Sequence, residues 1–483
     1  MKENTPGSGK KEQFRVLTTE QLQAIHDASL EILTTTGYHT PVAEARRLIL
    51  EGGGKVSGER TFITQEMVNT AMKSYRPVQM FDRVGNLSRV LSYGEVSFGT
   101  IADTFYVLDP YTKQVRKFLK DDQRWLAAVI DTLPGIDYVQ CVGQAHDVPD
   151  NLQTQVAVAQ TVEQTSKPLL IYPYDRNGLL DALDVIYLAC GGEMLFRQKP
   201  SLMCAAVPAA PLSGTDYSLE LLLTCAERQV PVLSYCCPAI GGNSPADIAA
   251  TMVLANADWL ASLVIHQLKH PGAPFCTAGF TVQLMDMHTS LWSYCAPETL
   301  AAYSAATELA HWYGFPAFGL EMTCDVPALD AQAGVEMMSE CQRAFLSGVE
   351  MVHNAGIYGA GKLCGAEAVI LADEIIASTR NAMKPVQVTE VGLAEAVRMI
   401  GEAGPLGEYI EKDYTLAHFR DFWYPSLFSR GMFDPLRDEP GFDLLQRLNE
   451  RARKLIENHH SVLSEETLRK INALKAGWYS RQT

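Results

Sequence analysis

Short apolar runs recur along the middle of this chain, and segments with a helical pattern separate them. The runs are DYVQCVG (137–143), PLLIYPY (168–174), PSLMCAAVP (200–208), VPVLSYCC (230–237), APFCTAGF (273–280), FPAFGLE (315–321) and GVEMVHNAG (348–356). Their first residues are 31, 32, 30, 43, 42 and 33 positions apart. Strands that alternate with helices at such intervals predict parallel βαβ units, and hence the α/β class. Several runs are apolar throughout, as strands buried on both faces are.

Seven strands at this spacing favour a (β/α)8 TIM barrel over an open doubly wound sheet, which we keep as the alternative. The eighth strand comes from the β-rich segment near 96–108 or from beyond residue 360, and the sequence leaves this open. Helical patterns cover 18–36, 64–73, 217–229, 297–314 and 365–380. We predict four parts: a disordered N-terminus (1–17), a mixed α+β extension (18–120), the barrel (121–440) and a helical tail packed on it (441–483).

The composition is that of a globular protein, with 47% hydrophobic and 20% charged residues among 483. A formal charge of −16 argues against nucleic acid as a partner, because phosphate binding needs a dense cationic face. The eleven cysteines form no CxxC pair and lie mostly in apolar runs, which suits a reducing compartment. The N-terminus lacks the apolar stretch of a signal peptide, and we find no run long enough to span a bilayer. We therefore expect a cytoplasmic protein with no membrane partner.

Active sites of TIM barrels lie at the C-terminal ends of the strands. The residues at those positions are Gln144, His146, Tyr172, Tyr174, Cys236, Phe280, Glu321, His353 and Asn354. His353 stands out because it ends a predicted strand beside Asn354 and a Gly-rich loop. A buried structural histidine is an equally good interpretation of the same pattern.

Two local motifs have weaker support. GIYGAGKL (356–363) nearly matches the phosphate-binding GxxxxGK[ST], but Leu363 offers no hydroxyl for Mg²⁺. We predict instead a flexible Gly-rich loop over the barrel mouth, whose glycines allow either positive φ angles or close approach to a ligand, with Tyr358 at its tip. His266 and His270 are spaced to share one helix face, yet Gln267 replaces the glutamate of HExxH, so ordinary helix histidines are favoured.

An aromatic and acidic cluster follows a glycine corner in FGTIADTFYVLDP. Its members Asp103, Phe105, Tyr106 and Asp109 would suit a cationic ligand, because aromatic faces attract cations. A β-hairpin with core aromatics is the other interpretation.

Four stretches carry a resemblance to one family: FGTIADTFYVLDPYTKQVRK, DAQAGVEMMSE, GAEAVILADEIIA and, most specifically, YTLAHFRDFWYPSLFSR, which ends at Arg430. They are similar to the trimethylamine methyltransferase (MttB-like) family of corrinoid-dependent enzymes, in the same order from about residue 18 to the end. The resemblance implies a TIM barrel that moves a methyl group from an N-methylated amine to the Co(I) corrinoid of a separate corrinoid protein. It implies no cofactor tightly bound in this chain, no metal site, and a homo-oligomer.

The best-known branch of that family carries pyrrolysine, whereas this chain has only standard residues. It therefore resembles the branch of glycine betaine, proline betaine, carnitine and γ-butyrobetaine demethylases, whose substrates are quaternary amines. On this basis we expect His353, Asn354 and Glu321 to be catalytic. We expect the substrate to be bound by Asp103, Tyr106, Tyr174, Phe280 and Tyr358.

Within that hypothesis, aromatic rings line the cation site, Asp103 or Glu321 balances its charge, and His353 and Asn354 orient a carboxylate or face the corrinoid. Two alternatives stay open. The chain could be a betaine-binding or scaffold protein without catalysis, or a zinc-dependent barrel methyltransferase or decarboxylase, although no convincing set of zinc ligands is visible.

Overall fold

Parallel strands occupy all seven predicted positions. The computed structural model describes residues 14–100, 104–140, 143–432 and 444–480. The strands are β7 (Val139–Gln140), β8 (Leu169–Ile171), β9 (Leu202–Ala205), β10 (Val232–Leu233) with β11 (Tyr235–Cys236), β13 (Ala278–Phe280), β16 (Ala317–Gly319) and β17 (Met351–Ala355). They are parallel to their neighbours, which confirms the α/β class.

A further parallel strand, β4 (Ser97–Thr100), lies within the segment 96–108 that the sequence offered as one source of the eighth. β4 pairs with β17 on one side and reaches β7 through a bridge between Gly99 and Tyr138 on the other. On the far side, Val232 of β10 bridges to Phe275, just ahead of β13. Followed from pair to pair, the parallel strands therefore return to β4.

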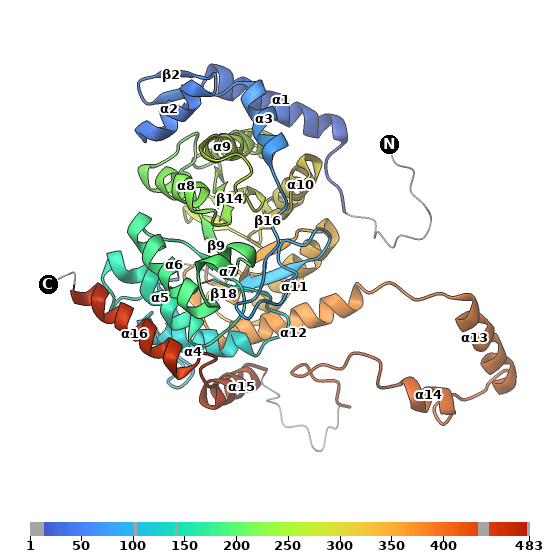
Figure 1. Ribbon diagram of the computed structural model, residues 1–483. Helices are drawn as coiled ribbons and strands as arrows, with labels where there is room; N and C mark the ends of the chain where they lie inside the picture. Colours follow the sequence, from blue (N-terminus) through green and yellow to red (C-terminus); the bar gives the residue numbers. More distant parts are fainter. Residues whose placement is uncertain (1–13, 101–103, 141–142, 433–443, 481–483) are drawn as a thin grey trace.

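Helices alternate with these strands and cover their outer faces (Figure 1). They are α4 (Lys120–Asp131), α5 (Gln153–Val162), α6 (Arg176–Cys190), α7 (Glu193–Gln198), α8 (Asp216–Arg228), α9 (Ile248–Lys269), α10 (Pro297–Tyr313), α11 (Ala331–Ser347) and α12 (Ala366–Ala382). The predicted N-terminal helices are α1 (Thr19–Thr35), which begins at a capping box on Thr18, and α3 (Gln65–Ser74). Together with α2 (Ala43–Glu51) they pack on α9, and β1 (Tyr38–His39), β2 (Lys55–Ser57) and β3 (Arg60–Phe62) form a small sheet beside them.

The buried apolar residues form two clusters, and the strands contribute alternate residues to each. The larger cluster lies between strands and helices. The smaller one collects the inward positions, among them Tyr138, Leu170, Met203, Leu233, Phe318 and Met351. Because successive side chains of a strand point to opposite faces, this division identifies which residues face the interior.

Two small sheets continue past the C-terminal ends of the parallel strands. One contains β5 (Tyr106–Leu108), β6 (Val115–Lys117), β18 (Ile357–Tyr358) and β19 (Leu363–Cys364), and the other contains β12 (Ala239–Ile240), β14 (Gln283–Asp286) and β15 (Leu291–Ser293). Since β5 follows β4 and β18 follows β17, the first sheet lies on the side where a site is expected.

Helix α9 is long and apolar enough to cross a membrane by length and composition, which corrects the expectation that no run of this chain reaches that length. However, 72% of its most apolar window is buried, against α1, α3 and α8 among others. Its apolar character is therefore explained by its position in the core.

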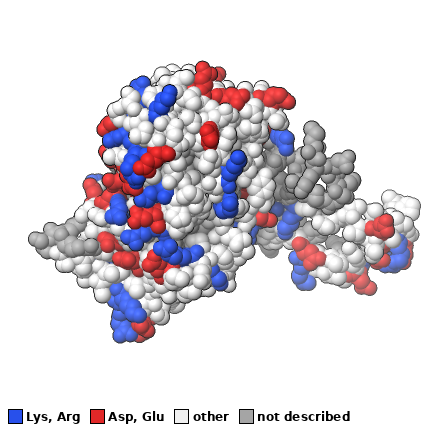
Figure 2. All heavy atoms as spheres, turned by 45° about the horizontal axis from the view of Figure 1, so that its top comes forward, with Lys and Arg blue, Asp and Glu red and all other residues white. Residues whose placement is uncertain are grey.

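The C-terminal tail is helical, as predicted. α15 (Leu444–Asn458) packs on α12 and α4, and α16 (Glu465–Ser480) packs on α6. Between α12 and α15 the chain leaves the body and carries α13 (Glu390–Ala403) and α14 (Asp413–His418) on an extension (Figure 1). Basic and acidic side chains are interspersed on the face drawn in Figure 2.

We expect a methyl group at Gly99 to destabilise the protein, because the added Cβ would overlap the ring of Tyr138. Overpacking of this kind costs roughly 1–3 kcal/mol, so Gly99→Ala should lower the thermal unfolding midpoint. Gly477 in α16 is the matched control, since its Cβ would meet open space. There, Gly→Ala in a helix should gain up to about 1 kcal/mol. Equal midpoints for Gly99→Ala and the wild type would show that the contact between β4 and β7 is not constrained by this glycine.

Candidate functional site

Four aromatic side chains meet at the C-terminal ends of β8, β11, β16 and β17. They are Tyr172, Tyr235, Phe318 and His353, which we call the aromatic quartet. Centroids of neighbouring rings are 6.4 Å (Tyr172–Tyr235), 4.7 Å (Tyr235–Phe318), 5.2 Å (Phe318–His353) and 5.8 Å (His353–Tyr172) apart. Each of the four rings contacts two others, so the ring contacts form a closed cycle. Three of the rings are buried, whereas Tyr172 is half-buried and joins the quartet to the surface.

Hydrogen bonds orient the quartet. The hydroxyl of Tyr172 lies 2.5 Å from the hydroxyl of Tyr235 and 3.3 Å from Nε2 of His353. Burial lowers the pKa of His353 to about 3, so its imidazole is neutral at physiological pH. A neutral imidazole donates through one nitrogen and accepts through the other. Nδ1 of His353 is buried and has no hydrogen-bond partner among the described residues.

A second inward polar group lies on β7. Gln140 is two residues beyond the inward-facing Tyr138, so its side chain lies on the same face of the strand. It is fully buried, and neither atom of its amide has a hydrogen-bond partner in the described part of the chain. Buried polar atoms are nearly always paired, so an amide and an imidazole nitrogen left over near one end of the strands indicate a place where a polar ligand group binds.

Two of the expected catalytic residues have partners within the protein. The side-chain amide of Asn354 donates to the carbonyl of Leu320 at 2.6 Å and so links β17 to the segment after β16. The pairing of β17 with β4 is irregular between Val352 and Ala355, which is where His353 and Asn354 lie. Glu321 is fully buried and forms an ion pair with Arg343, whose guanidinium also lies 5.2 Å from the ring of Tyr303. The charge of Glu321 is therefore already balanced.

The expected substrate-binding aromatics do not join the quartet. Phe280 packs edge-on against Trp259 of α9, at 5.5 Å, in the outer cluster. Tyr358 lies in β18 and is only 2% exposed, so it is not the tip of a flexible loop. The loop itself is a β18–β19 hairpin, which does have the predicted positive φ angles at its glycines. Burial also raises the pKa of the Tyr358 hydroxyl.

The other expected substrate-binding residues lie nearer the surface. Tyr106 is 42% exposed on β5, and Tyr174 is 40% exposed after β8. Asp103 lies outside the described residues.

The two histidines of HQLKH do not share a site. His266 is buried against Phe275, whereas His270 is exposed at the helix C-cap. A different group, Cys295, Asp325 and Glu336, places one ligand atom of each residue within 4.8 Å of the others. No spacing in the sequence pointed to this group. Asp325 there already accepts hydrogen bonds from the backbone of Tyr294 and Cys295, so it fixes the turn before α10.

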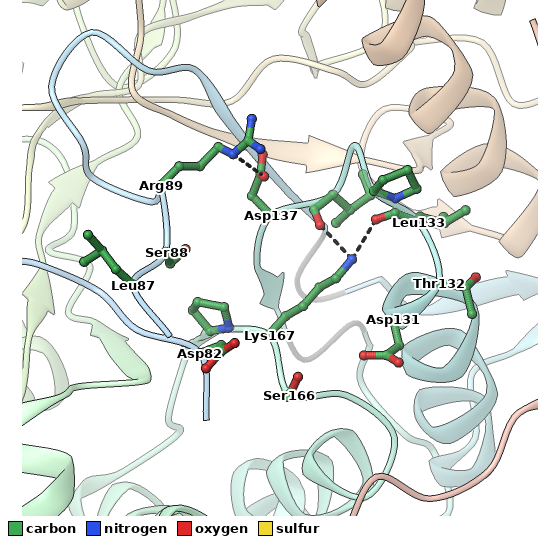
Figure 3. Close-up of a pocket in the computed structure, with 13 residues that line it drawn as sticks. Asp82, Leu87, Ser88, Arg89, Asp131, Thr132, Leu133, Asp137, Ser166 and Lys167 are labelled. Carbon is green, nitrogen blue, oxygen red and sulfur yellow. Dashed lines mark hydrogen bonds and ion pairs between the residues drawn. The ribbon is translucent and has the colours of Figure 1, made fainter. Parts of the chain in front are cut away.

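A hollow of about 410 Å³ opens at the opposite end of the strands, ahead of β7 and β8 (Figure 3). Lys167 spans it and donates to three carbonyl oxygens, those of Ile130, Leu133 and Ile136, at 2.7 Å each. Arg89 is paired with Asp137 at 3.1 Å on its rim. These groups tie the end of α4 to the strands, which is a stabilising role typical of the N-terminal face.

Sequence reasoning therefore singled out two members of the aromatic quartet. His353 and Tyr172 were both among the strand-end candidates, but Gln140, Tyr235 and Phe318 were not. The signal that could have found them is the alternation within each run. Residues two positions apart, such as Tyr138 and Gln140, must face the same side.

Comparison with known proteins gives a consistent result. The family model described as "Trimethylamine methyltransferase (MTTB)" matches residues 4–475. The trimethylamine methyltransferase MttB of Desulfitobacterium hafniense is 27% identical over 447 residues, which cover 91% of this chain and 89% of that protein. The glycine betaine methyltransferase of another strain is 27% identical over 453 residues, covering 92% and 93%. The solved structure of the Methanosarcina barkeri monomethylamine methyltransferase (MtmB) has a TM-score of 0.53 at 12% identity, over 94% of this chain and 90% of that one, and so shares the fold.

We expect acid to destabilise the protein partly through His353. Its pKa is about 3 when folded and about 6.5 when unfolded, so between these values the unfolded chain binds a proton that the folded chain does not. The stabilisation is present above pH 6.5 and is lost as the pH falls, by up to about 1.4 kcal/mol per pH unit. The unfolding midpoint of His353→Gln should thus depend less steeply on pH between 5 and 7 than that of the wild type. His270→Gln, at an exposed site, is the control, and parallel curves for the wild type and His353→Gln would contradict the assignment.

Proposed function

The chain belongs to the trimethylamine methyltransferase family, and from this premise we propose that it transfers a methyl group from a small quaternary amine to a corrinoid. The methyl acceptor is the reduced corrinoid of a separate corrinoid protein, as the family resemblance implies. The observation that carries the choice of a quaternary amine is the aromatic quartet with its neutral histidine.

Chemistry supports a quaternary donor. A tertiary amine is a poor methyl donor unless its nitrogen is held as a cation, whereas a quaternary ammonium already has a neutral amine as leaving group. Because the Co(I) corrinoid supplies the nucleophile, the residues of this chain need only bind the donor, orient its N–CH₃ bond and exclude water.

The quartet can recognise the cation without a dedicated carboxylate. Aromatic faces attract a quaternary ammonium by about 0.5–2 kcal/mol per contact, and more strongly where water is excluded. Tyr172, as the half-buried member, would meet the ligand first. A neutral His353 does not repel the positive charge, as a protonated one would. Glu321 is paired with Arg343, so we now assign charge recognition to the ring faces.

Gln140 and His353 would hold a carboxylate if the substrate is a betaine. The amide nitrogen of Gln140 can donate, and so can Nδ1 of His353 in one tautomer. Both atoms are buried without a hydrogen-bond partner in the described residues, and both lie at the C-terminal ends of strands that flank β4. Hydrogen bonds to a charged acceptor are about twice as strong as neutral ones, so these donors would select betaines over simple quaternary amines.

For the scaffold, we propose that the eight parallel strands close into a (β/α)8 barrel. The return of strand pairing to β4 and the separate inner cluster support this. The barrel domain would then include β4 and begin ahead of residue 121. We further propose that the active protein is a cytoplasmic homo-oligomer with no tightly bound cofactor of its own.

We expect the purified protein to methylate the Co(I) corrinoid of its cognate partner with a betaine and not with trimethylamine. The absorbance change of the corrinoid measures the reaction, against a panel of glycine betaine, proline betaine, carnitine, γ-butyrobetaine, choline and trimethylamine. Binding of a betaine without corrinoid methylation would favour a binding protein. Activity that depends on stoichiometric zinc, and is lost in Cys295→Ser, would favour the zinc enzyme.

Phe318→Leu should weaken substrate binding and leave the fold intact, since it removes one aromatic face of the quartet. A loss of about 0.5–2 kcal/mol would raise the KM about 2- to 30-fold. Phe280→Leu is the matched control, because that ring packs on Trp259 outside the quartet. An equal rise in KM in both variants, or none in Phe318→Leu, would remove the quartet from the substrate site.

Gln140→Leu tests the proposed carboxylate donor. It should raise the KM for glycine betaine more than for choline, which has no carboxylate. The same fold-change for both substrates would show that Gln140 does not contact the carboxylate.

A further inference from the structure

The extension between α12 and α15 exposes an unusual amount of apolar surface. We call residues 384–424 the arm; none of them is buried. Of the thirty-seven large hydrophobic side chains exposed in the described structure, fourteen lie in the arm. They are Val386, Val388, Val391, Leu393, Val397, Ile400, Leu406, Tyr409, Ile410, Tyr414, Leu416, Phe419, Phe422 and Tyr424. The arm is under a tenth of the chain, so this concentration is a local property and not the general background.

The longest helix of the arm, α13, is amphipathic, and none of its residues is buried by the parts of the chain that the structure describes. Leu393, Val397 and Ile400 recur at i, i+4 and i+7, and are 56%, 73% and 59% exposed. On the opposite face Arg398 binds Glu395 and Glu402, each at 2.5 Å. A helix of fourteen residues is marginal in water by itself and depends on packing of its apolar face.

The arm is firmly attached at both ends, so its position is not that of a frayed terminus. It leaves from the end of α12, and it returns where Glu374 of that helix accepts hydrogen bonds from the backbone of Ser426 and Leu427. Beside this return point the body has an apolar hollow of about 350 Å³, lined by residues of α11, α12 and α15 and by Phe428. The chain thus returns from the arm to the body beside an apolar hollow.

We propose that the arm is an assembly element that packs against a second copy of this chain. In a two-fold pair each arm meets the arm and neighbouring body of the other copy, because such an interface uses the same surface twice. Covering most of the fourteen side chains would bury on the order of 1,000 Å² per arm, or about 2,000 Å² for the pair before the opposing surfaces are counted. This buried area reaches the range found in obligate homodimers and is well above the area buried in transient contacts.

The position of the arm argues against the corrinoid protein as the partner that covers it. The end of α12 lies at the N-terminal ends of the strands, since Arg380 reaches Asp137 and Asp373 accepts from the backbone of Gly135, both ahead of β7. The arm therefore starts at the end opposite the aromatic quartet. A protein that presents its cofactor to the quartet must approach from the other side.

The test compares solution masses. We expect light scattering to give the wild type a mass of twice 53.2 kDa or a larger even multiple. The double variant Leu393→Glu/Val397→Glu should lose at least half of that mass, while the circular dichroism spectrum of the body stays unchanged. Glu395→Ala/Glu402→Ala alters the opposite face of the same helix and is the matched control, which should keep the wild-type mass.

Hydrogen exchange of α13 provides the second measurement. Its amides should be protected at high protein concentration and lose protection on dilution or in the double variant. A monomeric wild type, an assembly that survives the double variant, or protection of α13 at monomeric concentrations would each overturn the proposal. So would binding of the corrinoid protein that depends on Leu393 and Val397. None of these outcomes depends on which amine is the substrate.

Discussion

The arrangement of the parallel strands depends on how closely β4 fits between β7 and β17. At Gly99 the backbone lies against the ring of Tyr138, where a side chain larger than hydrogen would overlap it. The same tyrosine donates from its hydroxyl to the carbonyl of Val352 at 2.6 Å, across the interior. Ser97 donates to the carbonyl of Glu350 from both its backbone and its hydroxyl. β4, the first of the parallel strands along the chain, is thus held against β17, the last of them. Ser97 of β4 itself and Tyr138, just ahead of β7, make these contacts.

The candidate site is a consequence of that fit. β7 carries Gln140 and β17 carries His353, and β4 lies between them. It therefore sets the spacing of these two polar groups, which lack partners among the described residues. Rings from β8, β11 and β16 complete the surroundings of His353. These groups are neutral, and the excess of acidic residues lies elsewhere, largely on the surface with basic residues among them (Figure 2). Recognition of a cation would therefore rest on ring faces in a water-poor environment, where such contacts are strongest, and not on the net charge of the chain.

The sequence predicts the scaffold better than it predicts the site. Spacing and apolar content locate all seven strand runs, because both properties act within a few residues. They could not choose the source of the remaining strand, since β4 is defined by Gly99 meeting Tyr138 and by pairing with β17, more than two hundred residues away. The candidate site could not be predicted in this way. Glu321 is one example, because nothing near it in the sequence reveals its ion pair with Arg343. Phe280 is another case. Its place after a strand suggested the site, but only the packing on Trp259 shows that the ring faces the helices.

The two ends of the parallel strands differ in structure, and under the proposed function they would have different roles. At the C-terminal ends lie the two small sheets and the half-buried Tyr172. At the N-terminal ends, Lys167 donates to three carbonyls and Arg89 pairs with Asp137, and the arm departs from this end. Contacts between copies made by the arm would leave the C-terminal ends free. Oligomerisation and methyl transfer could then occur together, because they would use opposite ends of the same set of strands.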